Sequence, residues 1–153
     1  MRCKHAGLPI CAIGLSVLFG CEIATQQALL DAYHEAEPPN ELFVEVAESS
    51  YLGSPGHHPL LYYDFTWSGA QHSYRGTQKV LVFDRSYTYL GYYYLGSTLD
   101  LDQSKVSEKT ITLALEDGEP ERLFFHNGPP DQSASGELWF HPFQSLDRDY
   151  YRP

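Results

Sequence analysis

Six of the seven histidines lie beyond residue 30, where they could bind a metal ion or act as acid–base groups. They are His34, His57, His58, His72, His126 and His141. A neutral imidazole is a common ligand of zinc and copper, so loops that brought several together would form a metal site. However, no pair has the i, i+4 spacing of a helical site or the i, i+2 spacing of a strand site. We therefore expect histidines on surface loops and no metal site.

Other patterns of chemically active residues are incomplete. Asp100, Asp102 and Ser104 have the spacing that opens a calcium loop, but Lys105 stands where the loop needs glycine and Ile111 where it needs a bidentate glutamate. We expect a solvated acidic loop there. The chain has neither a G-x-S-x-G nor an S-x-x-K motif for a serine nucleophile. The sequence thus predicts no catalytic residues and no cofactor, and it favours a protein that is not an enzyme.

The most promising binding feature is a group of five tyrosines close together in the chain. They are Tyr87, Tyr89, Tyr92, Tyr93 and Tyr94. On a regular strand, the first, second and fourth of these would share one face, and the other two would share the opposite face. Both faces can be core only if the sheet is covered twice. We therefore predict an exposed aromatic surface that contacts a protein or a sugar ring; the alternative is that the rings pack in the core with their hydroxyls at its rim. Gly91 inside this strand indicates a bulge or the close approach of another backbone.

The amino terminus has the layout of a secretory signal. Arg2 and Lys4 precede an apolar run that ends in Leu18-Phe19-Gly20-Cys21. Leu18, Gly20 and Cys21 match the pattern at which bacterial lipoprotein precursors are lipidated and cleaved, whereas Phe19 departs from it. This part of the chain resembles such a precursor. Two alternatives remain, a soluble secreted protein and an uncleaved membrane helix. The usual A-x-A cleavage pattern is missing, and the apolar run of about 15 residues is shorter than the roughly 20 that span a bilayer.

The resemblance implies lipidation of Cys21 and anchoring of the protein to a membrane of the cell envelope. Stable anchoring requires more than one acyl chain, and lipoproteins of this family carry several on the cysteine. If the cell has two membranes, Glu22 in place of the aspartate that retains lipoproteins at the inner membrane favours the periplasmic face of the outer membrane. Cys3 and Cys11 would be lost with the signal, so no disulfide could stabilise the mature domain.

The chain is strongly acidic, with a net charge of −10 that becomes −12 if residues 1–20 are removed. Because affinity for nucleic acid depends on neutralising phosphates, this charge argues against a nucleic-acid partner. It also argues against a polybasic interaction with anionic lipid.

Periodicity divides the chain into a short helix and a β domain. Residues 22–37 have helical spacing and end at Pro38 and Pro39. Beyond them, two-residue alternation or short apolar runs predict about seven strands, at 41–46, 60–67, 79–83, 87–95, 110–115, 122–126 and 137–141. An Asp-Gly pair within 116–119 predicts one hairpin, and the short segment 84–86 predicts another. Longer connections are expected at 49–59, 68–77, 96–108 and 127–136.

These patterns predict a mainly β protein with one antiparallel domain, sandwich-like or barrel-like, after a short N-terminal helix. The expected organisation is a signal peptide (1–20), a lipidated N-terminus with a helix or tether (21–39) and the β domain (40–153). We expect a cell-envelope lipoprotein that binds an envelope protein or glycan. The alternatives are a hydrolase or metal-binding enzyme that uses the loop histidines, and a purely structural assembly lipoprotein.

Overall fold

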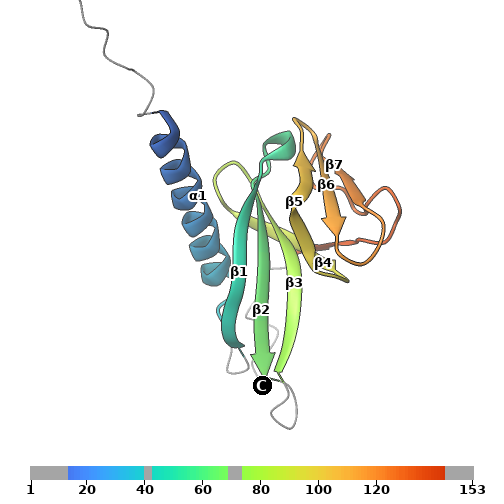
Figure 1. Ribbon diagram of the computed structural model, residues 1–153, viewed down its shortest axis with the longest axis horizontal. Coiled ribbons are helices and arrows are strands. Elements are labelled where there is room, and N and C mark those ends of the chain that lie inside the picture. The colour runs from blue at the N-terminus through green and yellow to red at the C-terminus, as the bar shows by residue number, and fades with distance from the viewer. Residues whose placement is uncertain (1–13, 40–42, 69–73, 144–153) are drawn as a thin grey trace, which may run out of the picture.

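The computed structural model describes residues 14–39, 43–68 and 74–143, with the side chains of the helix described from Glu22 onward. Figure 1 shows a helix, a larger sheet and a smaller sheet stacked as three layers. The elements are α1 (Gly14–Ala36), β1 (Phe43–Gly53), η1 (Pro55–His57), β2 (Leu60–Ser68), β3 (Tyr74–Phe83), β4 (Tyr89–Leu95), β5 (Leu99–Val106), β6 (Thr110–Leu115), β7 (Glu121–Phe124) and β8 (Phe140–Pro142). The mainly β, antiparallel fold with an N-terminal helix is confirmed.

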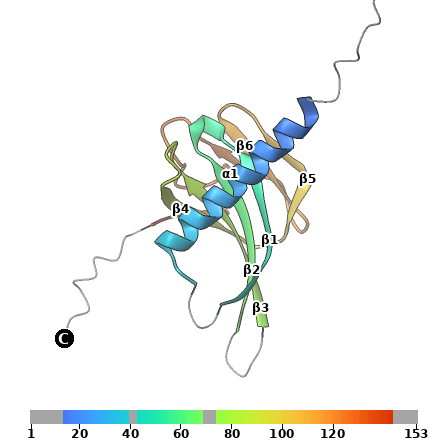
Figure 2. The ribbon, with the colours of Figure 1, turned by 90° about the vertical axis from the view of Figure 1, so that its left-hand side faces the viewer.

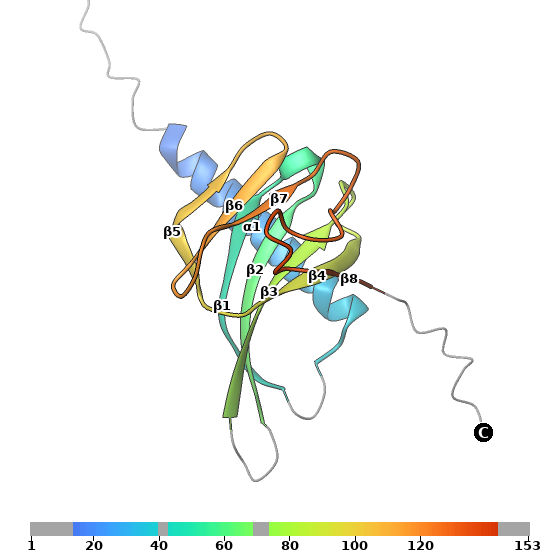
Figure 3. The same cartoon turned by 90° about the vertical axis from the view of Figure 1, so that its right-hand side faces the viewer.

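Both sheets are antiparallel, and they pack face to face. The larger sheet has the strand order β1-β2-β3-β4-β8, and the smaller has the order β5-β6-β7. The predicted hairpins join β3 to β4 and β6 to β7. Figures 2 and 3 show α1 crossing one face of the larger sheet and the smaller sheet covering the other. The larger sheet is therefore covered twice, which is the condition under which tyrosines on both of its faces can be buried.

Each interface of the larger sheet has its own apolar core. The side chains of Leu60, Val80 and Val82 point to the smaller sheet and pack with Ile111 and Leu113. Those of their strand neighbours point to α1 instead, among them Leu61, Tyr63, Leu81 and Phe83, and they pack with Leu29 and Tyr33 of the helix. Alternation along β2 and β3 thus supplies both cores, as expected of central strands whose two faces are buried.

Several boundaries differ from the predicted ones. The helix begins at Gly14 rather than residue 22, because no proline interrupts residues 14–36, and it ends at Ala36 before the two prolines, as predicted. The segment 96–108, predicted as a connection, contains β5, an exposed edge strand whose charged residues obscured its alternation. The last strand is β8, three residues long, rather than 137–141.

A bulge at Gly91 reverses the side-chain alternation of β4. Val82 of β3 pairs with Gly91 whereas the next residue, Phe83, pairs with Tyr89, so Leu90 has no opposite residue. Gly91 has a φ of +145°, and a Cβ there would clash with the backbone oxygen of His141. The prediction of a bulge and of a close backbone approach at Gly91 is confirmed.

Candidate functional site

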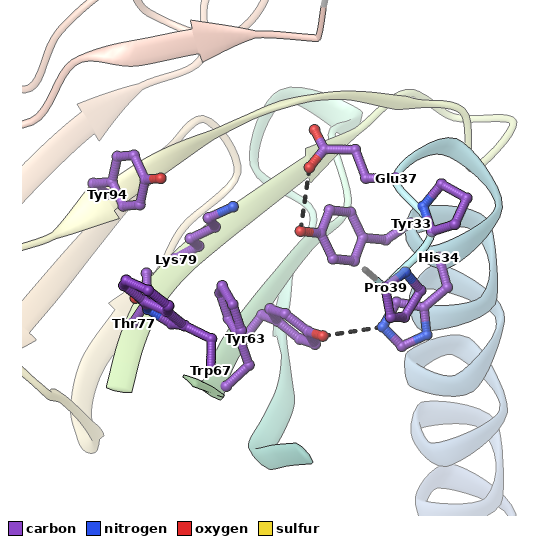
Figure 4. Close-up of a pocket in the computed structure, with 11 residues that line it drawn as sticks. Tyr33, His34, Glu37, Pro39, Tyr63, Trp67, Thr77, Lys79 and Tyr94 are labelled. Atoms are coloured by element: carbon purple, nitrogen blue, oxygen red, sulfur yellow. Dashed lines mark hydrogen bonds between the residues drawn. The ribbon is translucent and has the colours of Figure 1, made fainter. Parts of the chain in front are cut away.

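A cavity of about 340 Å³ lies between the C-terminal end of α1 and strands β2, β3 and β4. The helix and the residues after it contribute Tyr33, His34, Glu37, Pro38 and Pro39. The strands contribute Tyr63, Phe65, Trp67, Thr77, Lys79 and Tyr94. Figure 4 shows these side chains converging from the helix on one side and the sheet on the other.

The cavity lies where α1 ends before the strands that it covers. The helix ends at Ala36, while β2 and β3 continue past its end (Figures 1 and 2). Tyr63, Phe65 and Trp67 alternate along β2 and therefore share the face toward the helix. Tyr63 lies beneath the helix and is 2 % exposed, whereas Phe65 and Trp67 are only partly buried. The aromatic face of β2 thus continues from the core into the cavity.

Lys79 is the most unusual residue of the cavity, because it is a cation with only 6 % of its surface exposed. Its Nζ lies 4.2 Å from the ring centroid of Tyr92, 5.3 Å from that of Tyr94 and 5.4 Å from that of Phe65. Aromatic rings attract a cation through their quadrupole, but they do not neutralise it. Within the described part of the chain, Lys79 has no ion pair and no hydrogen bond. Burial lowers the pKa of Lys79, and the charge of Glu37 opposes this shift.

The helix side of the cavity is polar and held in place by hydrogen bonds. The Tyr33 hydroxyl donates to Glu37 Oε2 at 3.4 Å, and His34 Nε2 lies 3.0 Å from the Tyr63 hydroxyl. Both contacts are visible in Figure 4. Burial lowers the pKa of His34 and raises the pKa of Tyr63 to about 12, so both groups are neutral near pH 7. The wall of the cavity therefore presents uncharged hydroxyl and imidazole groups together with one carboxylate.

The predicted row of five tyrosines is not a single surface. Tyr89 (4 % exposed) packs in the helix-side core and Tyr93 (fully buried) in the core between the sheets, so the prediction that they share a face is wrong. The bulge at Gly91 separates them. Tyr87 precedes β4, in a turn where its φ is +64°, and does not continue the strand face.

Tyr92 and Tyr94 are the predicted tyrosines that reach the cavity region. Their rings meet edge to face at 4.8 Å, and both lie over the Lys79 ammonium. Tyr94 lines the cavity and is 46 % exposed. Tyr92 is half-buried and stacks on His141 with a centroid distance of 5.0 Å. For this pair the predicted binding role stays a prediction, while Tyr87, Tyr89 and Tyr93 lie away from the cavity lining.

The remaining histidines do not converge on the cavity. His57 is exposed, His58 packs on Phe125, and His126 stacks on Phe124. His72 lies outside the described residues. Among the residues that the structure describes, no group of three or more histidine, cysteine, aspartate or glutamate side chains could hold a metal ion.

The acidic segment at Asp100 lies in an irregular stretch of β5, where the pairing with β6 shifts register between Asp100 and Lys105. The Asp100 carboxylate accepts hydrogen bonds from the backbone amides of Asp102 and Gln103 and from the Gln103 side chain. Ser104 donates its hydroxyl hydrogen to the Asp100 carbonyl. The carboxylate and carbonyl oxygens of Asp100 and the hydroxyl of Ser104 are therefore already engaged in hydrogen bonds within β5.

Most residues of the cavity lie outside the site predicted from the sequence. The sequence held one sign of the cavity in Lys79, a charged residue at the head of a short apolar run that ends at Phe83 and is typical of a strand buried on both faces. No protein-family model, no curated protein and no solved structure matches the chain. Across the described residues, no helix has both the length and the apolar character needed to cross a membrane.

Proposed function

We propose that this chain is a lipoprotein of the bacterial cell envelope, anchored through Cys21, whose β domain binds a ligand in the cavity between α1 and the larger sheet. The observation that carries the binding proposal is Lys79, a buried ammonium group without an anionic partner among the described residues, in an aromatic-lined cavity. An unpaired charge is expensive to bury, and a titratable residue that is perturbed by desolvation and lies in a cleft is a candidate functional residue. Concave, mostly apolar sites with a few polar groups are the usual form of ligand sites.

Binding fits the cavity better than catalysis does. No serine or cysteine is among the described residues that line it. Its threonine, Thr77, accepts a hydrogen bond from Trp67 Nε1 at 3.1 Å, and its histidine is engaged with Tyr63. A nucleophile with an adjacent free base, which covalent catalysis requires, is therefore missing from this part of the wall.

The proposed anchor, Cys21, and the cavity residues Tyr33 and His34 lie on one continuous helix. Cys21 lies in α1. Five residues later in the same helix, Gln26 Nε2 donates a hydrogen bond to the Ser49 carbonyl of β1, at 2.8 Å. Five residues of helix rise about 7.5 Å, so a lipidated Cys21 would hold the domain close to the membrane surface. Cleavage before Cys21 would leave Gln26, Leu29 and Tyr33 attached to the domain.

The binding proposal is tested by capture from a solubilised cell-envelope fraction with the immobilised full chain in detergent. Trp67→Ala and Tyr94→Ala should each remove most of the captured material, because both side chains line the cavity. Trp139→Ala is the matched control, since Trp139 is 58 % exposed and lies outside the cavity. Equal capture by all four proteins, with circular dichroism showing that each is folded, would overturn the proposal.

The anchor is tested separately by metabolic labelling with a fatty-acid probe. The wild-type chain should incorporate label, and Cys21→Ala should incorporate none. Mass spectrometry of an unmodified chain that still begins at Met1 would contradict the lipoprotein assignment, while leaving the cavity experiment unaffected.

A further inference from the structure

We propose that the ligand of the cavity is a sugar that carries a single carboxylate, with Lys79 as the counter-ion of that carboxylate. This inference rests on the binding function proposed above and specifies the chemistry of its ligand. The charge of the cavity, the shape of its aromatic wall and the backbone around it all favour such a ligand.

The charge of the cavity fits one negative charge on the ligand. Lys79 is the only cation among the described residues that line the cavity, since burial keeps His34 neutral near pH 7. Arg75 is exposed and lies outside the lining, with its guanidinium 5.7 Å from the Trp67 ring centroid. A phosphate carries more charge and is usually held by several donors or by the fork of an arginine. Here Glu37 and the net charge of −10 of the whole chain would repel a second negative charge. A monocarboxylate is therefore the anion that best matches this site.

The wall of the cavity fits a sugar ring. Trp67, Phe65 and Tyr94 offer large, rigid apolar surfaces, which suit the C–H faces of a pyranose. The hydroxyls of Tyr33 and Tyr63 and the carboxylate of Glu37 lie at the opposite, helix side, where they can exchange hydrogen bonds with ring hydroxyls (Figure 4). The volume of about 340 Å³ is at the lower end of the roughly 300–1,000 Å³ of small-molecule sites.

The backbone around the cavity argues against a peptide. Peptides that bind to sheets usually add a strand and depend on free backbone groups at an edge. The cavity is built mainly on β2 and β3, which are paired on both sides, and on β4, which is paired with β3 and, at residues 91–93, with the short strand β8. Recognition here must therefore come from side chains, as it does for a sugar.

The experiment is a fluorescence titration of the full chain in detergent, carrying Trp139→Phe so that Trp67 is the single tryptophan reporter. The chain has two tryptophans, so this one substitution isolates the signal from the cavity. The probes are methyl glucuronoside and methyl glucoside, which differ only in the carboxylate at C6. N-acetylmuramic acid and N-acetylglucosamine form a second pair, with the carboxylate at another position. The acidic member of at least one pair should bind ten-fold or more tighter than its neutral partner.

Lys79→Met keeps the aliphatic stem and removes the charge, so it should reduce the affinity for the acidic sugar to that of the neutral one. Lys79→Arg keeps the charge and should retain a preference for the acidic sugar. Lys105→Met is the matched control, because Lys105 is exposed on β5, and it should change neither affinity.

Three outcomes would overturn the inference. One is equal affinity for the acidic and neutral sugars, and another is an acid preference that survives in Lys79→Met. The third is tighter binding of inorganic phosphate, or of N-acetylphenylalanine as a stand-in for a peptide carboxyl terminus, than of any acidic sugar. If envelope capture still depends on Trp67 while no sugar binds, the ligand class is wrong and the binding function stands. If capture is also independent of Trp67, the proposed function itself has failed.

Discussion

The two faces of the larger sheet are built from alternate residues of the same strands, yet they differ in chemistry. Toward the smaller sheet, β3 presents Val80 and Val82, both fully buried. Toward the helix, the same strand presents Lys79, Leu81 and Phe83. The first face is covered by another sheet and closes as an apolar core. The second is covered by a single helix that ends before the strands do, and a cavity remains at its end.

The difference in cover between the two faces indicates where a binding site can form without weakening the fold. Two sheets packed face to face form a continuous layer about 10 Å thick, in which any polar group would need a partner. One helix covers a narrower strip, so residues of the same strand beyond it can serve a ligand. The core between the sheets should therefore determine stability, and the helix side should determine binding.

The largest effect is expected at Gly91, where β4 changes the face to which its side chains point. Gly91→Ala would place a Cβ against the backbone of His141 and Pro142 at a φ that side chains rarely adopt. Backbone strain of about 1–3 kcal/mol and overpacking of about 1–3 kcal/mol together predict a loss of roughly 4 kcal/mol in the free energy of unfolding. Urea denaturation followed by circular dichroism measures it. Gly118→Ala is a control with a positive φ but open space within 4 Å of the added methyl group, and it should lose less; equal losses would show that β8 does not confine Gly91.

The next effect separates the two faces directly. Leu113→Ala, in the core between the sheets, should lower the free energy of unfolding by about 3 kcal/mol, as buried leucines do, and leave ligand affinity unchanged in the folded fraction. Tyr94→Ala, at the cavity, should change stability by less than about 1 kcal/mol, because the side chain is 46 % exposed, and should remove binding. Urea denaturation and the capture assay, applied to both variants, measure this contrast. A Tyr94 variant as unstable as the Leu113 variant would contradict the separation of roles.

Alternation in the sequence was sufficient to predict the central strands. Residues 60–67 and 110–115 lie in β2 and β6 because their apolar and polar residues already follow a two-residue period. It failed for β5, whose Asp100, Asp102 and Lys105 lie on an edge strand with one exposed side. A period reports burial, so a strand that is mostly exposed gives a weak pattern.

The cavity could not be predicted in the same way, because its residues come from segments far apart in the chain. Its walls join the end of α1 to β2, β3 and β4. The prediction that Tyr89 and Tyr93 share a strand face failed for a related reason. A single bulge at Gly91 moved Tyr93 to the face opposite Tyr89, and a local pattern cannot show how a bulge will redirect the residues that follow it.

A small effect on stability is also expected for Lys79→Met, and its size depends on pH. Burying the ammonium without a carboxylate destabilises the fold by several kcal/mol, and the surrounding rings offset about 2 kcal/mol of this. The variant should therefore be more stable than the wild type by about 1 kcal/mol near neutral pH. Because burial lowers the pKa of Lys79 in the folded state, the unfolded chain binds more protons between that lowered pKa and 10.5. Wild-type stability should thus rise relative to the variant as the pH increases through this range.

The difference between the two proteins isolates Lys79, because buried tyrosines such as Tyr63, whose pKa is raised to about 12, titrate in both and cancel. Urea midpoints of wild type and Lys79→Met, measured from about pH 7 to about pH 10.5, should converge. Parallel curves would mean that the ammonium is as well solvated in the folded chain as in the unfolded one. In that case Lys79 would not be a poorly solvated cation that a ligand carboxylate could stabilise. The two faces of the larger sheet would then differ in shape alone.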